Sequence, residues 1–145
     1  LGNLTSQLLV NVYMNEFDQF VKHRLRAKFY VRYADDFVLM SRDRAQLENW
    51  LSWVDVFLVN QLSLNLHPDK VSIKTLASGV DFLGWVHFPR HRVLRPTTKR
   101  RMLKRLSDNP TDEVLASYLG LLSHGQTYGL RRHVKTLPHT KTRPA

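Results

Sequence analysis

The chain has 145 residues, 43% of them apolar, which suits one domain or two small lobes with a buried core. It contains no cysteine, which excludes disulfides and thiolate metal sites. A formal charge of +10 and a pI near 10.3 favour a polyanionic partner.

The first half of the chain predicts two helices with a β-hairpin between them. Apolar residues at helical spacing predict a helix from about Thr5 to His23. Its apolar positions are Leu4, Leu8, Leu9, Val12, Tyr13, Phe17, Phe20 and Val21. A hairpin is expected at about 28–41, and Asp43 and Gln46 then resemble a capping box that starts a second amphipathic helix. The apolar stripe of that helix consists of Leu47, Trp50, Leu51, Val54, Leu58 and Leu62.

The second half predicts a short sheet followed by helices. In order, we expect a loop turning into a strand at 64–74, a hairpin of Val80–Phe88 and Arg92–Arg95, a basic helix from Pro96 to Leu106, a helix from about Thr111 to Gly125, and a last helix at 127–135. The boundary between a sheet-bearing lobe and a helical lobe is expected near Pro96. The tail 137–145 has little to bury and is expected to be disordered.

An acidic pair at the tip of the first hairpin is the most informative feature of the sequence. Apolar strand residues flank Tyr33-Ala34-Asp35-Asp36 on both sides. Adjacent carboxylates repel each other, and a hard divalent cation such as Mg²⁺ removes that objection. Because neighbouring strand residues point to opposite faces, Asp35 is expected to be the main metal ligand and Asp36 a supporting one. The alternative is a solvated turn, in which Asp is common.

Five motifs in the same order resemble reverse transcriptases. Tyr33-Ala34-Asp35-Asp36 resembles their Tyr-x-Asp-Asp signature on the palm hairpin. The other four are Leu1–Gln7, similar to the Gly-x-x-x-Ser opening of a palm helix, Leu64–Lys70, similar to the leucine-rich segment ending in Lys, Phe82–Trp85, similar to the primer-grip hairpin, and Ser117–His124, similar to a thumb helix.

The resemblance implies an α+β fold, part of a right-hand polymerase palm in which helices pack on an antiparallel sheet with a metal-binding hairpin. Residues 1–95 are expected to form the C-terminal part of this palm, and 96–136 a small helical thumb-like region. The resemblance also implies RNA-directed DNA polymerase activity by two-metal nucleotidyl transfer with Mg²⁺ or Mn²⁺, an RNA template, a DNA primer or cDNA, and dNTPs.

Further residues receive roles from this resemblance. Lys70 is a candidate partner for the departing pyrophosphate, or an exposed loop lysine. Gly2 allows a nucleotide to approach the backbone closely, and Asn3, Ser6 and Gln7 are candidates to bind the incoming nucleotide or template at a helix start, or else ordinary capping residues.

Nucleic-acid contacts are expected at two further places. Gly84 and Trp85 are expected to lie against the primer end, although Trp85 also suits a core position, and Tyr33 is expected to bind nucleic acid. The acid-free stretch from Phe82 to Ser107 carries a basic run that favours phosphate contacts or a solvated face. The residues of this run expected to bind nucleic acid are Lys99, Arg100, Arg101, Lys104 and Arg105.

The form of the first motif points to a subtype. Leu1 and Gln7 stand where most reverse transcriptases have Gln and Pro, and this form resembles the polymerases of diversity-generating retroelements. That resemblance implies error-prone cDNA synthesis, with misincorporation opposite adenine, and a small basic accessory protein. A group II intron or retron polymerase is the alternative within the family, and a non-catalytic nucleic-acid-binding fragment is the alternative of another class.

The fingers and a further metal-binding Asp of the family have no counterpart in the sequence, so we expect a fragment of a longer polymerase that is inactive in isolation. No apolar run approaches the roughly 18 residues of a membrane span. The first residues also lack the layout of a signal peptide. A cytoplasmic protein of a bacterium or phage host, without a membrane partner, is therefore expected.

Overall fold

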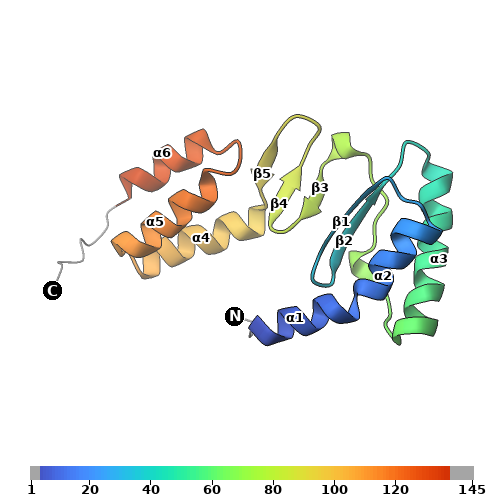
Figure 1. The fold of residues 1–145 in the computed structure, drawn as a ribbon. Coiled ribbons are helices and arrows are strands. Elements are labelled where there is room, and N and C mark those ends of the chain that lie inside the picture. The colour runs from blue at the N-terminus through green and yellow to red at the C-terminus, as the bar shows by residue number, and fades with distance from the viewer. Residues whose placement is uncertain (1–3, 138–145) are drawn as a thin grey trace. The chain divides into compact units, whose positions relative to one another are not determined.

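The computed structural model describes residues 4–137, which form helices and small antiparallel sheets and confirm the expected α+β class (Figure 1). The chain divides into two compact units, Leu1–Ile73 and Lys74–Ala145. The division expected near Pro96 therefore falls inside the second unit. In the described part of the chain, no helix is both long enough and apolar enough to cross a membrane.

The first unit contains a long helical stretch, a hairpin and a second helix. Its elements are α1 (Leu4–Tyr13), α2 (Asn15–Gln19), the short π-helix η1 (Phe20–Arg24), β1 (Phe29–Tyr33), β2 (Asp36–Met40) and α3 (Arg44–Leu62). The helical ladder continues across Met14, whose amide bonds to the Val10 carbonyl at 2.8 Å and whose carbonyl accepts from the Asp18 amide at 3.1 Å. The predicted helix through His23 is thus confirmed as one stretch.

The core of the first unit lies between this helical stretch, the hairpin and α3. Buried residues of the stretch face buried residues of α3 at helical spacing. They are Met14, Phe17, Val21 and Leu25 on one side and Trp50, Val54, Leu58 and Leu62 on the other. Phe17 contacts the rings of Tyr30 and Phe37 at centroid distances of 6.1 and 4.7 Å, so it joins the helical stretch to both strands of the hairpin.

The start of α3 is capped by one half of the predicted box. The Asp43 carboxylate accepts from the Ala45 amide at 2.9 Å, as an N-cap residue does. Gln46 instead accepts from the Ser41 hydroxyl, so it does not return to the Asp43 amide as the capping box requires. After α3 the chain forms the 3-10 turn η2 (Pro68–Lys70) but no strand before Ile73, so the strand expected at the end of 64–74 is wrong.

The second unit contains a three-stranded sheet followed by three helices. Its elements are the 3-10 turn η3 (Leu76–Ser78), β3 (Val80–Phe82), β4 (Trp85–His87), β5 (Arg92–Leu94), α4 (Pro96–Asp108), α5 (Asp112–Leu122) and α6 (Tyr128–Thr136). The three predicted helices are confirmed. The segment 80–88 is not one strand, because Leu83 and Gly84, with φ of 52° and 81°, turn it into the β3–β4 hairpin.

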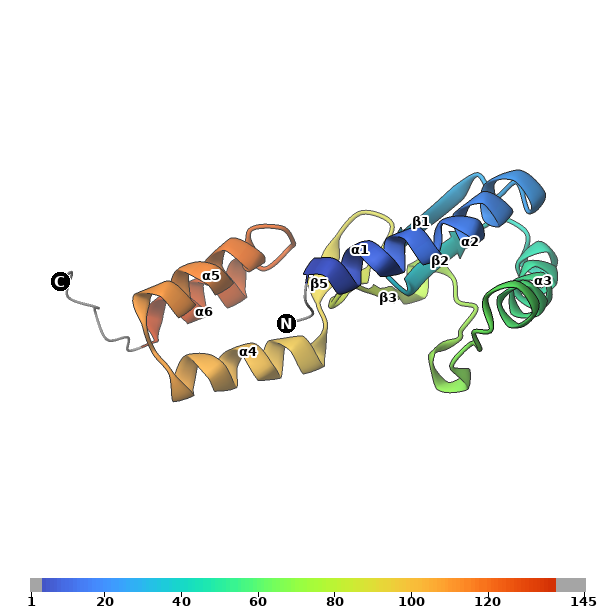
Figure 2. The same ribbon diagram turned by 60° about the horizontal axis from the view of Figure 1, so that its bottom comes forward.

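The sheet and helices of the second unit share one core. Trp85 and Leu94 from the sheet are buried with residues of all three helices, namely Met102, Leu106, Leu122 and Val134. In Figure 2, α5 and α6 lie side by side, connected by a short turn. The hairpin expected to belong to the palm is therefore packed on the helical lobe. The tail after Leu137 lies outside the described residues.

Candidate active site

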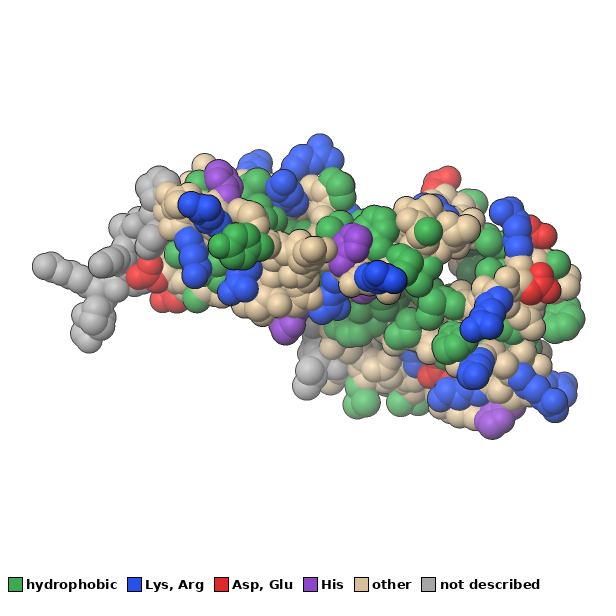
Figure 3. All heavy atoms as spheres, turned by 90° about the horizontal axis from the view of Figure 1, so that it is seen from above, with side chains coloured by type: hydrophobic (Ala, Val, Ile, Leu, Met, Phe, Trp, Pro, Cys, Tyr) green, Lys and Arg blue, Asp and Glu red, His purple; other side chains and the backbone are tan. Residues whose placement is uncertain are grey.

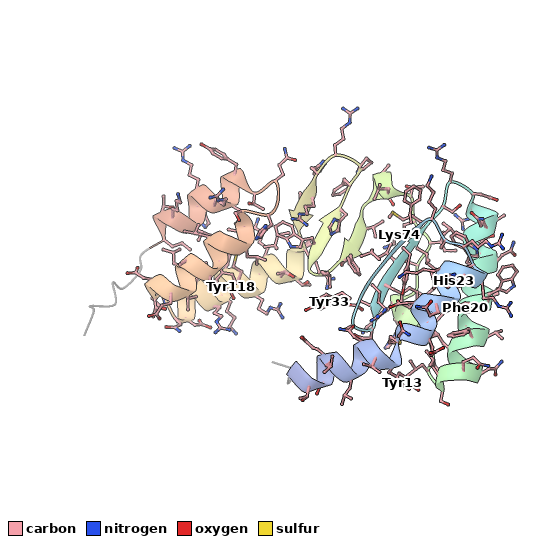
Figure 4. The ribbon with its side chains drawn as sticks, in the orientation of Figure 1. Tyr13, Phe20, His23, Tyr33, Lys74 and Tyr118 are labelled. Carbon is pink, nitrogen blue, oxygen red and sulfur yellow. The ribbon has the colours of Figure 1, made fainter. Side chains whose placement is uncertain are left out.

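The turn of the β1–β2 hairpin presents the two aspartates. Tyr33 pairs with Asp36 and closes a turn whose two central residues are Ala34 and Asp35. Figure 4 shows Tyr33 at this turn end of the hairpin. Ala34 has a φ of 52°, in the left-handed region that residues with a Cβ seldom occupy. Both carboxylates are exposed, Asp35 from the turn and Asp36 from the first position of β2.

The two carboxylates suit a hard cation as a partial ligand set. In the part of the chain that the structure describes, no hydrogen bond or ion pair engages either of them. Across the same described residues, no third His, Cys, Asp or Glu completes a metal-binding cluster with them. Since Mg²⁺ takes about six oxygen ligands and keeps several waters, two carboxylates can hold it only with water, phosphate or further protein oxygens.

Arg32 bonds the core-facing side of the hairpin to the helical stretch. Its Nε and Nη2 donate to the two carboxylate oxygens of Asp18 at 2.8 and 2.7 Å. Its Nη1 donates to the Asn11 side-chain oxygen at 3.1 Å and to the Ala34 carbonyl at 2.7 Å. The Tyr30 hydroxyl donates to Asp18 at 2.6 Å. One guanidinium thus connects α1, α2 and the turn.

This network shifts the ionisation of its members. Hydrogen bonds from Arg32 hold the pKa of Asp18 below its usual value, and the Tyr30 hydroxyl acts in the same direction against the effect of burial. Burial, together with the hydrogen bond to Asp18, raises the pKa of Tyr30. The hydrogen bonds to Asp18 raise the pKa of Arg32. The ion pair is therefore charged throughout the physiological range.

Sequence reasoning missed this network, although one signal was present. Tyr30 and Arg32 occupy the positions of β1 that alternate toward the core. An arginine at such a position requires a carboxylate partner, because a buried unpaired charge is costly. Glu16 and Asp18 are the acidic residues of the preceding helical stretch, and in the packed structure Asp18 is the one that pairs with Arg32.

Helix α1 is bonded to the hairpin through Asn11, whose side-chain oxygen accepts from Arg32. Ser6 and Gln7 are exposed in its first two turns. Gln7 precedes Asn11 by four residues and so shares its helix face, the face that contacts Arg32. Gly2 and Asn3, which were also predicted to bind nucleotide, lie outside the described residues. Lys70 is exposed at the end of η2, and its ammonium makes no hydrogen bond or ion pair with described residues.

The β3–β4 hairpin corrects the role expected for Trp85. Its side chain is only 6% exposed and packs into the core of the second unit, with the Arg92 guanidinium 5.2 Å from the ring centroid. It therefore cannot itself pack on a primer sugar in this conformation. Gly84 lies in the turn, and the exposed side chain at the tip is that of Leu83, which is 45% exposed. The signal for Leu83 was the Leu-Gly pair between two short β-rich triplets.

Helix α4 presents the predicted basic residues to solvent. Met102 and Leu106 are buried, and the charged side chains cover the rest of the helix surface. The exposed basic residues are Lys99, Arg100, Arg101, Lys104 and Arg105. Figure 3 shows Lys and Arg side chains on the visible surface of each unit, with acidic side chains among them.

Comparisons with known proteins agree with the motifs. Residues 1–87 match the family described as Reverse transcriptase (RNA-dependent DNA polymerase). Protein YkfC of Escherichia coli (strain K12) is 28% identical over 144 residues, an alignment that covers 77% of this chain and 36% of that protein. The chain thus spans about a third of the length of this curated relative. Because the family match includes the whole acidic hairpin and more than half of the sequence, the chain belongs to the reverse transcriptase (RNA-dependent DNA polymerase) family.

Proposed function

We propose that this chain is part of an RNA-directed DNA polymerase that makes cDNA from an RNA template by two-metal nucleotidyl transfer. The observation that carries the proposal is the tight turn that leaves Asp35 and Asp36 exposed side by side on an anchored hairpin. Carboxylates in that arrangement suit Mg²⁺ or Mn²⁺ and have no structural partner among the described residues.

In this proposal the residues of the turn have different roles. Asp35 and Asp36 hold the metal, with Asp35 as the main ligand. Bound Mg²⁺ supplies Lewis-acid activation of the primer hydroxyl and charge stabilisation at the triphosphate. Tyr33 is directly opposite Asp36, on the exposed face of the hairpin, and we propose that its ring packs on bound nucleic acid.

The incoming nucleotide is bound at the start of α1. Ser6 and Gln7 offer exposed hydrogen-bonding side chains there, and Gly2 and Asn3 precede them in the sequence. Lys70 is proposed to neutralise the departing pyrophosphate. Its exposure and lack of an ion-pair partner among described residues leave its ammonium free for a phosphate.

The primer–template duplex is bound by the second unit. The basic face of α4 suits phosphate contacts, and the tip of the β3–β4 hairpin, with Leu83 and Gly84, suits an approach to the primer end. Trp85 supports that hairpin from the core rather than touching the primer.

Within the family, we infer the error-prone enzyme of a diversity-generating retroelement, acting in the cytoplasm with a small basic accessory protein. The support is the form of the motif Leu1–Gln7. A group II intron or retron polymerase is the alternative, and the error spectrum of the cDNA discriminates the two.

A non-catalytic nucleic-acid-binding role is the second candidate. Two observations favour it, the charge of +10 and the presence of only two clustered carboxylates among the described residues. We propose instead that a longer polymerase supplies the further carboxylate, since the chain spans 36% of its curated relative. Residues 1–145 alone are then expected to bind nucleic acid without extending a primer.

The test is primer extension by the longest natural protein that contains residues 1–145. Asp35→Asn should abolish extension while leaving primer–template binding and thermal stability unchanged, because it removes a metal ligand that has no hydrogen bond or ion pair with a described residue. Asp55→Asn is the matched control, an equal loss of charge at an exposed position of α3. Undiminished extension by Asp35→Asn would refute the assignment, and a wild-type protein that binds duplex but never extends it would favour the non-catalytic role.

A further inference from the structure

The Arg32 guanidinium is bonded to the backbone of the candidate metal-binding turn. Four hydrogen bonds use its three nitrogens, and its side chain is 9% exposed. Arg32 donates three of them to side chains of the helical stretch, one to Asn11 and two to Asp18. The fourth goes to the Ala34 carbonyl at 2.7 Å, so Arg32 links the turn to a packed part of the first unit.

The Ala34 carbonyl is a sensitive point for the orientation of Asp35. It belongs to the peptide unit that also contains the Asp35 amide, and this unit is planar. Fixing the direction of the carbonyl therefore fixes the backbone torsions on both sides of it. Ala34 is also held at a φ of 52°, which residues with a Cβ avoid, so an unsupported turn has other conformations to adopt.

We propose that Arg32 is a positioning residue that sets the direction of the Asp35 carboxylate through the Ala34–Asp35 peptide, and that Asp18 holds Arg32 in place. The inference rests on the proposed role of Asp35 as a metal ligand. Arg32 itself touches neither metal nor substrate in this scheme, and it acts through the backbone.

The charge of Asp18 has a second effect on the same site. A guanidinium bonded to the backbone carbonyl beside a metal-binding carboxylate repels a divalent cation, and the repulsion is larger where water is partly excluded. Asp18 pairs through both of its oxygens with the Nε–Nη2 edge of Arg32 and compensates this charge. Asp18→Asn therefore both loosens Arg32 and leaves its charge uncompensated.

The experiment compares Arg32→Lys and Asp18→Asn with wild type in the longest natural protein that contains the chain. Lysine keeps the positive charge but lacks the planar fork that reaches Asp18 and Ala34 together. Both variants should raise the Mg²⁺ concentration for half-maximal extension by about tenfold or more, because small misplacements of a reacting group are costly. Both should also weaken Mn²⁺ binding to the protein without nucleic acid, followed by electron paramagnetic resonance.

Tyr30→Phe is the structural control. It removes a partly buried hydrogen bond to Asp18 but leaves the four hydrogen bonds of Arg32 to Asn11, Asp18 and Ala34 in place. It should lower the melting temperature without changing the Mg²⁺ or Mn²⁺ response. If Tyr30→Phe changes the metal response as much as Arg32→Lys at equal loss of stability, Arg32 has only a structural role and the inference is wrong.

Asp35→Asn separates this inference from the proposed function. If Asp35→Asn retains extension, the proposed function itself fails. If Asp35→Asn abolishes extension but Arg32→Lys and Asp18→Asn keep the wild-type metal dependence, only the positioning role is refuted. A variant that does not fold is replaced by the other, since either one alone tests the link between Ala34 and Asp18.

Discussion

Gly125 is the position where one added methyl group has the largest expected effect on the second unit. It lies in the turn between α5 and α6, against the buried indole of Trp85. A Cβ added there would lie 2.1 Å from Cζ3 and 2.7 Å from Cη2 of the indole. The Arg92 guanidinium lies over the same indole, and the Gln126 amide is bonded to the Arg92 carbonyl at 3.0 Å. The ring and the turn therefore have little freedom to move apart.

The expected cost follows from overpacking. Such insertions into a packed core cost about 1–3 kcal/mol. The smaller entropy of the unfolded chain returns about 0.4–1 kcal/mol when Gly becomes Ala. The net loss of unfolding free energy for Gly125→Ala is therefore about 1–2 kcal/mol. For a unit of this size it corresponds to a melting temperature lower by roughly 5–15 °C.

Gly120→Ala is the matched control, because a Cβ at that position of α5 meets nothing within 4 Å. Alanine is about 1 kcal/mol better than glycine inside a helix, so this variant should melt higher than wild type. Thermal unfolding followed by circular dichroism measures both changes. Trp85→Phe should partly rescue Gly125→Ala, because it removes the two closest ring atoms. The packing argument would be refuted if both glycine variants shifted the melting temperature in the same direction, or if Trp85→Phe did not reduce the effect of Gly125→Ala.

Three further predictions concern charge and fidelity. Four exposed basic residues of α4 can be replaced together by Gln, namely Arg100, Arg101, Lys104 and Arg105. The replacement should weaken duplex binding for all sequences and flatten the salt dependence of binding. An unchanged salt dependence would mean that these residues only face solvent and make no phosphate contacts. Because Arg32 holds the pKa of Asp18 low, Asp18 contributes stability that is present above its unfolded pKa of about 3.9 and is lost as the pH falls through the lower folded value. Urea unfolding should therefore show the stability difference between wild type and Asp18→Asn shrinking toward acid pH, and a constant difference would contradict the ion pair. Leu1→Gln in the polymerase should lower misincorporation opposite template adenine while preserving extension, since an amide restores a hydrogen-bonding group, and identical error spectra of sequenced cDNA would make Leu1 a packing residue.

Local patterns in the sequence were sufficient for most elements of the fold. The period of apolar residues predicted the helical stretch through His23, α3 and the three later helices. The acidic pair between two apolar strands predicted the β1–β2 hairpin and its exposed turn. These features depend on residues close together in the chain, so they can be predicted without the tertiary structure.

Two strand predictions failed for a different reason. The segment before Ile73 has strand-like residues but forms no ladder, because strand character requires a partner as well as propensity. The stretch 80–88 became two strands because Leu83 accepts a positive φ beside Gly84, a conformation that propensity assigns to Gly or Asn.

What the sequence by itself determined is which residues are candidates for the site, the two aspartates and the basic residues of α4, because these side chains face solvent and have no hydrogen-bond or ion-pair partner among the described residues. The tertiary structure alone decided which residues support them. Trp85 is buried because the sheet packs on α4–α6 and on Gly125. Arg32 reaches Asp18, 14 residues earlier, because the helical stretch packs Phe17 against the same face of the hairpin. Partners of a buried charge are set by which surfaces come together, and that is a property of packing rather than of neighbouring residues.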